Sequence, residues 1–159
     1  MSGNIMTNDT DEDALIYFEN ENVSEVEDLE EGSIFIFYNS NLVMIFDSKR
    51  KIWVIPSGKK EKNETMVECI TRETFERTGA ILEIVFLIGS YTVLEGITPV
   101  KKGIYFGKAS RFEPRLEWCE ADLVKLFDEL PQEVEDKKMY EMVLDYIKLK
   151  NYLNTKKDN

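Results

Sequence analysis

The feature that most constrains this chain is the stretch 53–79, WVIPSGKKEKNETMVECITRETFERTG. It continues an apolar segment, 52–55, that is typical of a buried strand. Pro56 stops this strand because it lacks the N–H that a ladder needs, and Gly58 then allows the backbone to turn. A helix rich in acidic residues follows. We therefore expect the strand to deliver a glycine loop to the start of this helix.

The helix is predicted over 65–78. Thr65 and Glu68 have the spacing of a capping box, and Gly79 suits the position at which a helix ends. The residues expected to face the core are Val67, Ile70 and Thr74.

The polar side of this helix carries two carboxylates at helical spacing. Glu73 and Glu76 lie one turn apart and therefore point to the same side. Together with the carbonyl of Gly58 they suit Mg²⁺ or Mn²⁺, hard cations that take oxygen ligands and share them with substrate phosphates. The alternative is a solvated helix stabilised by pairs such as Glu68 with Arg72, each worth about 0.3 kcal/mol.

Composition narrows the chemistry. The 159 residues include no histidine, which excludes Ser-His-Asp and Cys-His catalysis and metal sites built on imidazole. Cys69 and Cys119 are far apart and form no CxxC pair.

The net charge of -11 opposes broad binding to nucleic acid, so a phosphorylated ligand must be received locally. The candidate cations are Lys59, Lys60 and Lys62 near the glycine loop and Lys101 with Lys102 further on, although lysines on loops are also commonly just solvated.

Six positions of the stretch fall on the pattern G-x5-E-x7-R-E-U-x-E-E-x-G-U, in which U is a bulky aliphatic residue: Gly58, Glu64, Arg72, Glu73, Glu76 and Gly79. This pattern resembles the signature of the Nudix hydrolase family, and segments beyond it resemble the YtkD group of MutT-like Nudix proteins. The resemblance implies an α/β fold, an α/β/α sandwich with a mixed β-sheet between helices. It also implies a Mg²⁺- or Mn²⁺-dependent pyrophosphohydrolase that acts on a nucleoside triphosphate or a related nucleoside-diphosphate-linked substrate, such as oxidised dGTP or an RNA 5′ end.

The resemblance further implies roles for individual residues. One of Glu73 and Glu76 would act as a general base toward the attacking water, and both would be catalytic. The expected metal positions are Gly58, Glu73, Glu76 and, from a later loop, Glu120, with Glu117 and Glu113 as alternatives. The expected brace of the motif is Glu64, Arg72 and Gly79, and the expected phosphate-binding residues are Lys59 and Lys60. The aromatic candidates for stacking on a base, which also suit the core, are Tyr38, Phe46, Trp53 and Tyr91.

Arg77 departs from the signature, because the family carries there the second glutamate of a pair and commonly uses it as a metal ligand. A fixed positive charge about 4 to 6 Å from a metal opposes binding by about 1 kcal/mol or more. Two outcomes are open. Arg77 turns outward and the other ligands hold the metal, or it pairs with Glu73 or Glu76 and leaves a nucleotide-binding or regulatory protein without catalysis. Milder departures are Ser57, Thr74 and Ala80.

The rest of the chain predicts a single domain over 14–153, with a mobile acidic tail at 1–13 and a frayed end at 154–159. An edge strand is expected at 14–18, a central hairpin at 33–38 and 42–46, and long strands at 81–94 and 103–109 joined by a loop. Further β structure is expected near Trp118, and Leu130 and Pro131 are expected to open a last helix. Its apolar stripe is Met139, Val143, Tyr146, Ile147 and Leu153.

No apolar run approaches the ~20 residues of a membrane helix, and the first residues are acidic where a signal peptide is basic. We therefore expect a cytoplasmic protein. Whether it is a monomer or a homodimer stays open.

Overall fold

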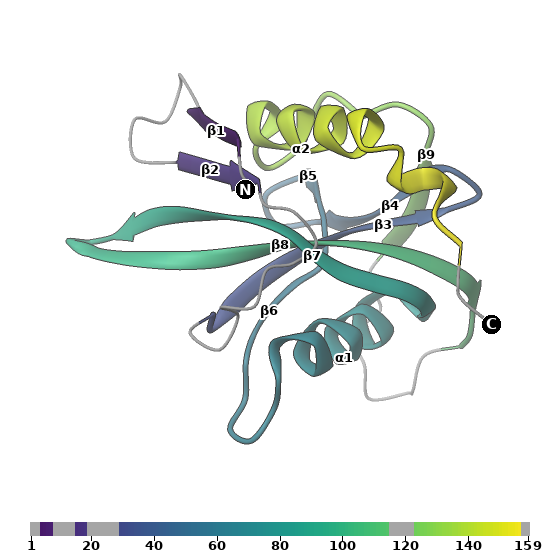
Figure 1. Ribbon diagram of the computed structural model, residues 1–159. Coiled ribbons are helices and arrows are strands. Elements are labelled where there is room, and N and C mark those ends of the chain that lie inside the picture. Colours follow the sequence, from purple (N-terminus) through teal and green to yellow (C-terminus); the bar gives the residue numbers. More distant parts are fainter. Residues whose placement is uncertain (1–3, 8–14, 19–28, 115–122, 157–159) are drawn as a thin grey trace.

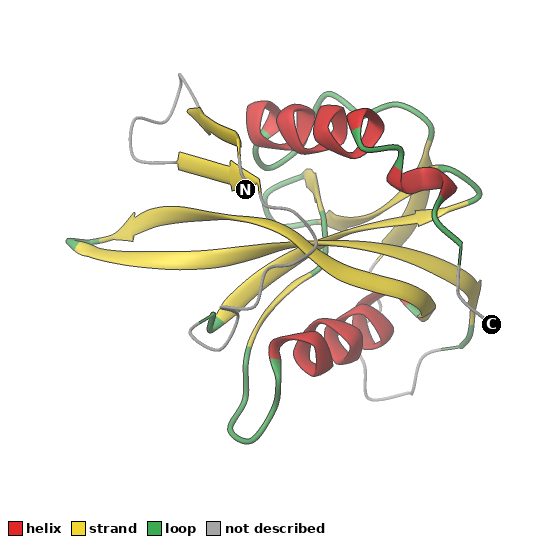
Figure 2. Ribbon diagram, viewed as in Figure 1, coloured by secondary structure: helices red, strands yellow, loops and turns green. Residues whose placement is uncertain are grey.

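The computed structural model describes residues 4–7, 15–18, 29–114 and 123–156. A mixed β-sheet lies between two helices, α1 (Met66–Thr78) on one face and α2 (Lys137–Leu149) on the other (Figures 1 and 2). The predicted α/β/α sandwich is therefore confirmed.

The described strands form one sheet in the order β1-β2-β7-β8-β3-β4-β5, while β6 pairs with β3 and β9 pairs with β4. The sheet is mixed because β3 and β8 run parallel, whereas the other strand pairs are antiparallel. The strands are β1 (Asn4–Thr7), β2 (Leu15–Phe18), β3 (Glu31–Tyr38), β4 (Asn41–Asp47), β5 (Ile52–Val54), β6 (Ser57–Lys59), β7 (Ala80–Glu95), β8 (Thr98–Phe112) and β9 (Leu123–Phe127).

The central hairpin forms as predicted, because β3 and β4 are joined by the two residues Asn39 and Ser40. Their φ angles of 50° and 68° are both positive, as the tight turn of a two-residue hairpin requires. Both strands are buried along most of their length. The hairpin therefore lies in the middle of the sandwich.

The long hairpin of β7 and β8 differs from the prediction at its tip. The expected loop extended to Lys102, but Thr98 already pairs with Glu95, and Gly96 turns the chain with a φ of 68°. The ladder runs up to this turn because glycine adopts a positive φ without steric cost. The hairpin projects beyond the sandwich in Figure 1.

The last helix begins at Lys137, so the prediction that Leu130 and Pro131 open it is wrong. Asp136 caps the helix, with its Oδ1 accepting from the N–H of Met139 at 3.2 Å. The segment before it runs alongside β5, where the N–H of Trp53 donates to the carbonyl of Glu133 at 2.7 Å. This contact between distant segments keeps 130–135 out of a helix where local signals favour one.

The apolar stripe of α2 packs on the sheet as predicted. The ring of Tyr146 stacks on Phe18 of β2 with 4.1 Å between centroids. Leu153, in the short 3-10 helix η1 (Tyr152–Asn154), packs partly buried against the same cluster. The buried helix residues are Met139, Tyr140, Val143, Tyr146 and Ile147.

Three other features of the fold were either predicted differently or not predicted from the sequence. Asn4–Thr7, within the expected mobile tail, form β1 and pair with β2. Near the other end, the Lys108 ammonium donates to the carbonyls of Leu153 and Thr155 at 2.9 and 2.8 Å. Strand β9 was not predicted, and the β structure expected near Trp118 lies outside the described residues.

Across the described residues, neither helix is long and apolar enough to cross a membrane.

Candidate active site

The ends of α1 are fixed by the residues that the sequence indicated. The Thr65 hydroxyl accepts from the N–H of Glu68 at 3.0 Å, and Glu68 Oε1 accepts from the N–H of Thr65 at 2.8 Å. Gly79 ends the helix with a φ of 78°, and its N–H donates to the carbonyl of Phe75. These caps set the register of the helix and therefore the direction in which its acids point.

The buried face of α1 differs by one residue from the prediction. Ile70 and Thr74 are fully buried, but Val67 is 43% exposed, so its assignment to the core face is wrong. Met66 and Cys69 are buried instead, which completes an i, i+3, i+4 stripe. Burial raises the pKa of the Cys69 thiol to about 11, so this thiol is protonated at neutral pH.

Gly58 lies directly against the acidic side of the helix. It pairs with Gly32 of β3, and a Cβ added to it would stand 2.5 Å from Cγ of Glu73 and 3.1 Å from Sγ of Cys69. No side chain fits in this space without movement of the helix. The close approach therefore explains why glycine is needed at this position.

Arg72 binds the acidic residues together. Its Nε and Nη2 donate to the two carboxylate oxygens of Glu64 at 2.8 and 3.1 Å, the bidentate geometry that arginine favours. Its Nη1 lies 3.1 Å from Glu73 Oε2 and 3.5 Å from Glu76 Oε1. Hydrogen bonds from Arg72 and, secondly, from the Glu61 N–H lower the pKa of Glu64 to about 2. The same contact with Glu64 raises the pKa of Arg72.

Glu73 and Glu76 thus meet at a single cationic atom, Nη1 of Arg72, and both side chains are partly exposed. The two carboxylates, with Gly58 packed against Glu73, supply oxygen atoms of the kind that a hard divalent cation prefers. In the segments that the structure describes, no three Asp, Glu, Cys or His side chains converge on one point suited to a metal. The donor set therefore fits such a cation but is incomplete in the described part of the chain.

The later acid is not placed. Glu120 and Glu117 lie outside the described residues. Glu113 accepts from Nε of Arg111 at 2.7 Å in an exposed pair, next to the strand end that leads to them.

Arg77 contributes to the lining of a pocket of about 310 Å³ that also includes Asp47, Arg50, Ser57 and Glu135. The cation found between Glu73 and Glu76 is Arg72, which the sequence assigned only to the brace. The signal was available, since Arg72 and Glu76 have i, i+4 spacing.

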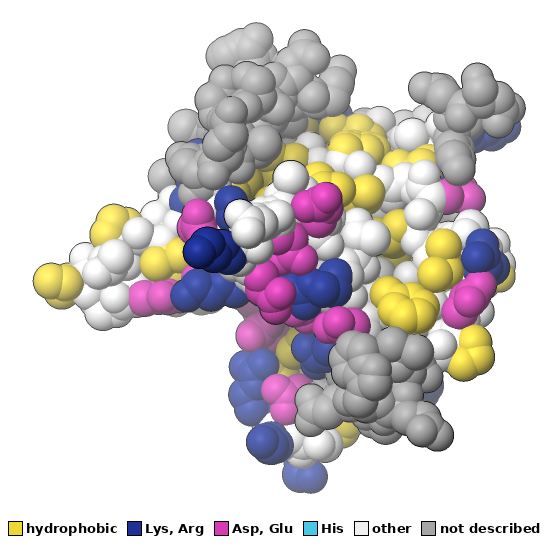
Figure 3. Space-filling model, turned by 90° about the horizontal axis from the view of Figure 1, so that it is seen from below, with side chains coloured by type: hydrophobic (Ala, Val, Ile, Leu, Met, Phe, Trp, Pro, Cys, Tyr) yellow, Lys and Arg dark blue, Asp and Glu magenta, His cyan; other side chains and the backbone are white. Residues whose placement is uncertain are grey.

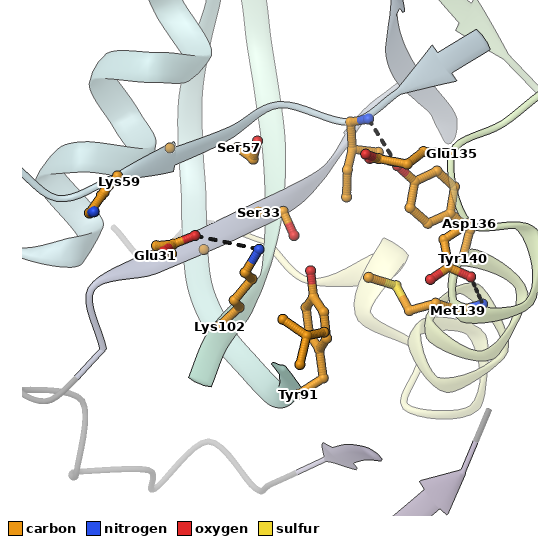
Figure 4. Close-up of a pocket in the computed structure, with 14 residues that line it drawn as sticks. Glu31, Ser33, Ser57, Lys59, Tyr91, Lys102, Glu135, Asp136, Met139 and Tyr140 are labelled. Atoms are coloured by element: carbon orange, nitrogen blue, oxygen red, sulfur yellow. Dashed lines mark hydrogen bonds and ion pairs between the residues drawn. The ribbon is translucent and has the colours of Figure 1, made fainter. Parts of the chain in front are cut away.

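A larger pocket of about 440 Å³ opens beside Gly58 on the α2 side of β3 and contains the predicted Lys59 (Figure 4). Lys60 does not line it, and its ammonium lies 3.9 Å from Glu30. The pocket lining joins strand ends to the start of α2: Glu31, Gly32, Ser33, Ile55, Ser57, Gly58, Lys59, Tyr91, Val93, Lys102, Glu135, Asp136, Met139 and Tyr140.

Of the four aromatic candidates, Tyr91 lines this pocket. Phe46 and Trp53 pack on one another with centroids 5.0 Å apart, and Tyr38 packs edge-on against Phe112. Ser33 was missed, because a single serine at the start of an apolar strand carries no functional signal in the sequence.

The face seen from the α1 side shows acidic and basic side chains interleaved (Figure 3). This distribution agrees with local rather than broad reception of a charged ligand.

No protein-family model matches the chain. In sequence, it is 28% identical over 117 residues to a Bacillus subtilis protein described as "Putative 8-oxo-dGTP diphosphatase YtkD", with 62% of this chain and 74% of the relative covered. In structure, it is similar to the Bacillus subtilis pyrophosphohydrolase BsRppH, with a TM-score of 0.76, 20% identity, and 92% and 97% of the two chains covered. It is also similar to a Nudix hydrolase from Clostridium perfringens, with a TM-score of 0.57, 18% identity, and 77% and 98% covered.

The fold is therefore that of the Nudix hydrolases. The partial sequence similarity to YtkD and the similarity of fold agree with the resemblance inferred from the motif.

Proposed function

We propose that the protein is a Nudix-type pyrophosphohydrolase, dependent on Mg²⁺ or Mn²⁺, that hydrolyses a phosphoanhydride bond of a nucleoside triphosphate or a related nucleoside-diphosphate-linked substrate. The observation that carries this proposal is the position of Gly58. It packs on Glu73 of the acidic helix and also lines the larger pocket, so one residue joins the acids to the place where a substrate fits.

Each residue of the junction has a distinct role in this proposal. Glu73 and Glu76, with the Gly58 carbonyl and a later acid such as Glu120, would hold the cation. When bound, the cation neutralises phosphate charge and lowers the pKa of a water molecule. One of the two helix acids accepts the proton of the attacking water. Lys59, at the rim of the pocket, receives a phosphate.

Glu64 and Arg72 support these acids without reacting. Glu64 holds Arg72 through two hydrogen bonds, so Arg72 would keep its position if Glu73 and Glu76 held a cation. Loss of the contacts between Arg72 and the two acids is the local free-energy cost of cation binding. The brace therefore positions the two acids.

The substrate is proposed at the level of its class. The relative named for 8-oxo-dGTP favours oxidised dGTP among nucleoside triphosphates, and a triphosphate at an RNA 5′ end offers the same reacting bond.

A second candidate is a Nudix-fold nucleotide-binding protein without catalysis. Two observations favour it: Arg72 already contacts both helix acids, and Arg77 stands where the family carries a further acid. In this case nucleotides bind and are not hydrolysed.

One assay separates the two candidates. Purified protein is incubated with a panel of nucleoside triphosphates, 8-oxo-dGTP and a triphosphorylated RNA, each with Mg²⁺ or Mn²⁺, and released phosphate and pyrophosphate are measured. Glu73→Gln tests the site, and Glu68→Gln is the matched control, because it makes the same change on the same helix and glutamine retains the capping box.

We expect metal-dependent turnover that falls by about 100-fold or more in Glu73→Gln and is retained in Glu68→Gln. Nucleotide binding without turnover would favour the second candidate. Turnover that survives Glu73→Gln would place the chemistry elsewhere.

A further inference from the structure

Ser33 is an unusual residue of the larger pocket. It is only 6% exposed, it lines the pocket from β3, and its Oγ makes no hydrogen bond of 3.5 Å or less among the described residues, although the Tyr91 hydroxyl lies near enough to interact with it at longer range. A buried hydroxyl without a partner is costly, so such groups in native structures call for an explanation. Figure 4 shows this hydroxyl directed into the pocket.

A second hydroxyl points to the same place. Tyr91 reaches from β7 across β8, and its hydroxyl is directed toward Ser33 (Figure 4). Burial raises the pKa of Tyr91 to about 12, and the neighbouring Ser33 offsets only part of that rise. Tyr91 therefore remains neutral at physiological pH and can both donate and accept a hydrogen bond.

The two ends of the pocket differ in charge. Lys59, the backbone of Gly58 and Glu31, whose carboxylate is paired with Lys102, form one end, next to the acidic helix. The other end joins the apolar side chains of Ile55 and Met139 to Glu135 and Asp136 at the start of α2. Glu135 is paired with Arg50 at 3.3 Å, but Asp136 and the apolar walls still disfavour a phosphate there and suit a neutral flat ring with polar edges.

Lys102 does not change this difference in charge between the two ends of the pocket, because its ammonium is already paired. Its ammonium lies 3.4 Å from Glu31 and 3.7 Å from Glu95. The hydroxyl of Ser33 lies between the phosphate end and the α2 end of the pocket, where a base attached to the bound phosphates would meet it.

We infer that Ser33, assisted by Tyr91, is a specificity-determining residue that binds the polar edge of the nucleobase, with the base toward α2 and the phosphates toward Gly58. This inference rests on the proposed function for the orientation of the substrate. It assigns the choice among bases to two hydroxyls on strands β3 and β7, away from the acids of α1.

The test measures equilibrium binding, so it does not depend on turnover. Inosine monophosphate, whose ring carries a carbonyl and an N–H, is compared with purine riboside monophosphate, whose ring carries neither. Calorimetry gives the ratio of their two Kd values for the full chain and for Ser33→Ala, Tyr91→Phe and Ser90→Ala. Ser90 is the matched control, because it is another buried strand serine, 4% exposed, that does not line the pocket.

We expect wild type to favour inosine monophosphate, and Ser33→Ala to reduce that preference by about 5- to 10-fold. Tyr91→Phe should reduce it in the same direction by less, and Ser90→Ala should leave it unchanged. A preference that is unaltered in Ser33→Ala, or an equal loss for both nucleotides, would overturn the inference.

Tyr91→Phe decides the matter if Ser33→Ala does not fold, since it removes one hydroxyl and keeps the ring. The outcomes also separate this inference from the proposed function. A protein that shows the expected ratios without hydrolysing any nucleotide retains the inference and loses the activity. A protein that hydrolyses nucleotides, but whose ratio of Kd values is the same in wild type and in all variants, retains the proposed activity and loses the inference.

Discussion

The two sides of Gly58 differ in how their polar groups are used. On the α1 side, the carboxylates of Glu64, Glu73 and Glu76 all contact Arg72, and no space remains for even a methyl group at Gly58. On the α2 side, a pocket of about 440 Å³ contains the buried hydroxyl of Ser33, which makes no short hydrogen bond in the described part of the chain and faces the Tyr91 hydroxyl. The difference indicates that the acids proposed to react are fixed by close packing and ion pairs. The Ser33 hydroxyl, proposed to recognise the ligand, is not held by a short hydrogen bond.

Gly58→Ala should have the largest effect, because it breaks the contact between the two sides. The added Cβ would meet Cγ of Glu73 at 2.5 Å and displace the helix or the loop. We expect a loss of about 1–3 kcal/mol in the free energy of unfolding. Turnover should fall by about 100-fold, because a small misplacement of reacting groups is costly. Urea denaturation and phosphate release measure the two effects.

Gly96→Ala is the control for this substitution. It introduces the same methyl group at a turn with a positive φ and open space, so it strains the backbone without touching either side of Gly58. Equal losses of activity in the two variants would contradict a specific role for the close packing at Gly58.

Arg72→Ala tests the α1 side alone. It removes the shared cation and leaves three neighbouring carboxylates to repel one another, so we expect a loss of about 1–2 kcal/mol in the free energy of unfolding. Arg72→Lys should recover only part of it, because lysine cannot form the bidentate contact. Full recovery in the lysine variant would show that charge, rather than geometry, holds the acids.

Arg77→Glu places an acid where the Nudix signature has one. Since a nearby positive charge opposes a metal by about 1 kcal/mol, we expect Mn²⁺ to bind about 5-fold more tightly, with base preference unchanged. Calorimetric titration with Mn²⁺ measures the gain. If affinity does not increase, Arg77 is not the residue that limits the metal site.

The smallest effect is expected in the pH dependence of stability. The pKa of Glu64 falls from an ordinary 4.5 to about 2 on folding, mainly through Arg72. Its stabilising contribution is therefore complete above pH 4.5 and is lost as the pH falls toward 2. Glu64→Gln should lower the urea midpoint at neutral pH and flatten its decline in acid.

The same substitution at Glu83, an exposed acid on β7, is the control and should change neither quantity. An unchanged acid profile in Glu64→Gln would indicate that the Glu64–Arg72 contact does not stabilise the folded chain.

The sequence predicted the α1 side well because its signals are local. The capping box of Thr65 and Glu68 and the end of the helix at Gly79 depend on residues within one turn. The start of α2 failed for the opposite reason, since backbone contacts between Trp53 and 133–135 override local preference. Strand β9 was not predicted because only Val124 and Phe127 are partly buried, a spacing that does not show the alternation of a strand, and because its pairing with β4 is long-range.

The pocket was least accessible to sequence reasoning. Ser33 and Tyr91 are brought together only because β8 lies between β3 and β7 with a particular register, in which Ser33 is opposite Ile104 and Tyr91 is opposite Lys102. Spacing along the chain does not encode that register. The choice of Glu120 as a later acid remains a prediction.

The central claim is that chemistry and recognition are separated across Gly58. The most direct measurement is the Kd of a nucleoside monophosphate for Glu73→Gln, taken beside the rate of triphosphate hydrolysis by the same protein. We expect an unchanged Kd while turnover falls by about 100-fold or more. If affinity falls in parallel with turnover, the acidic helix also binds the nucleotide and the two sides are not separate.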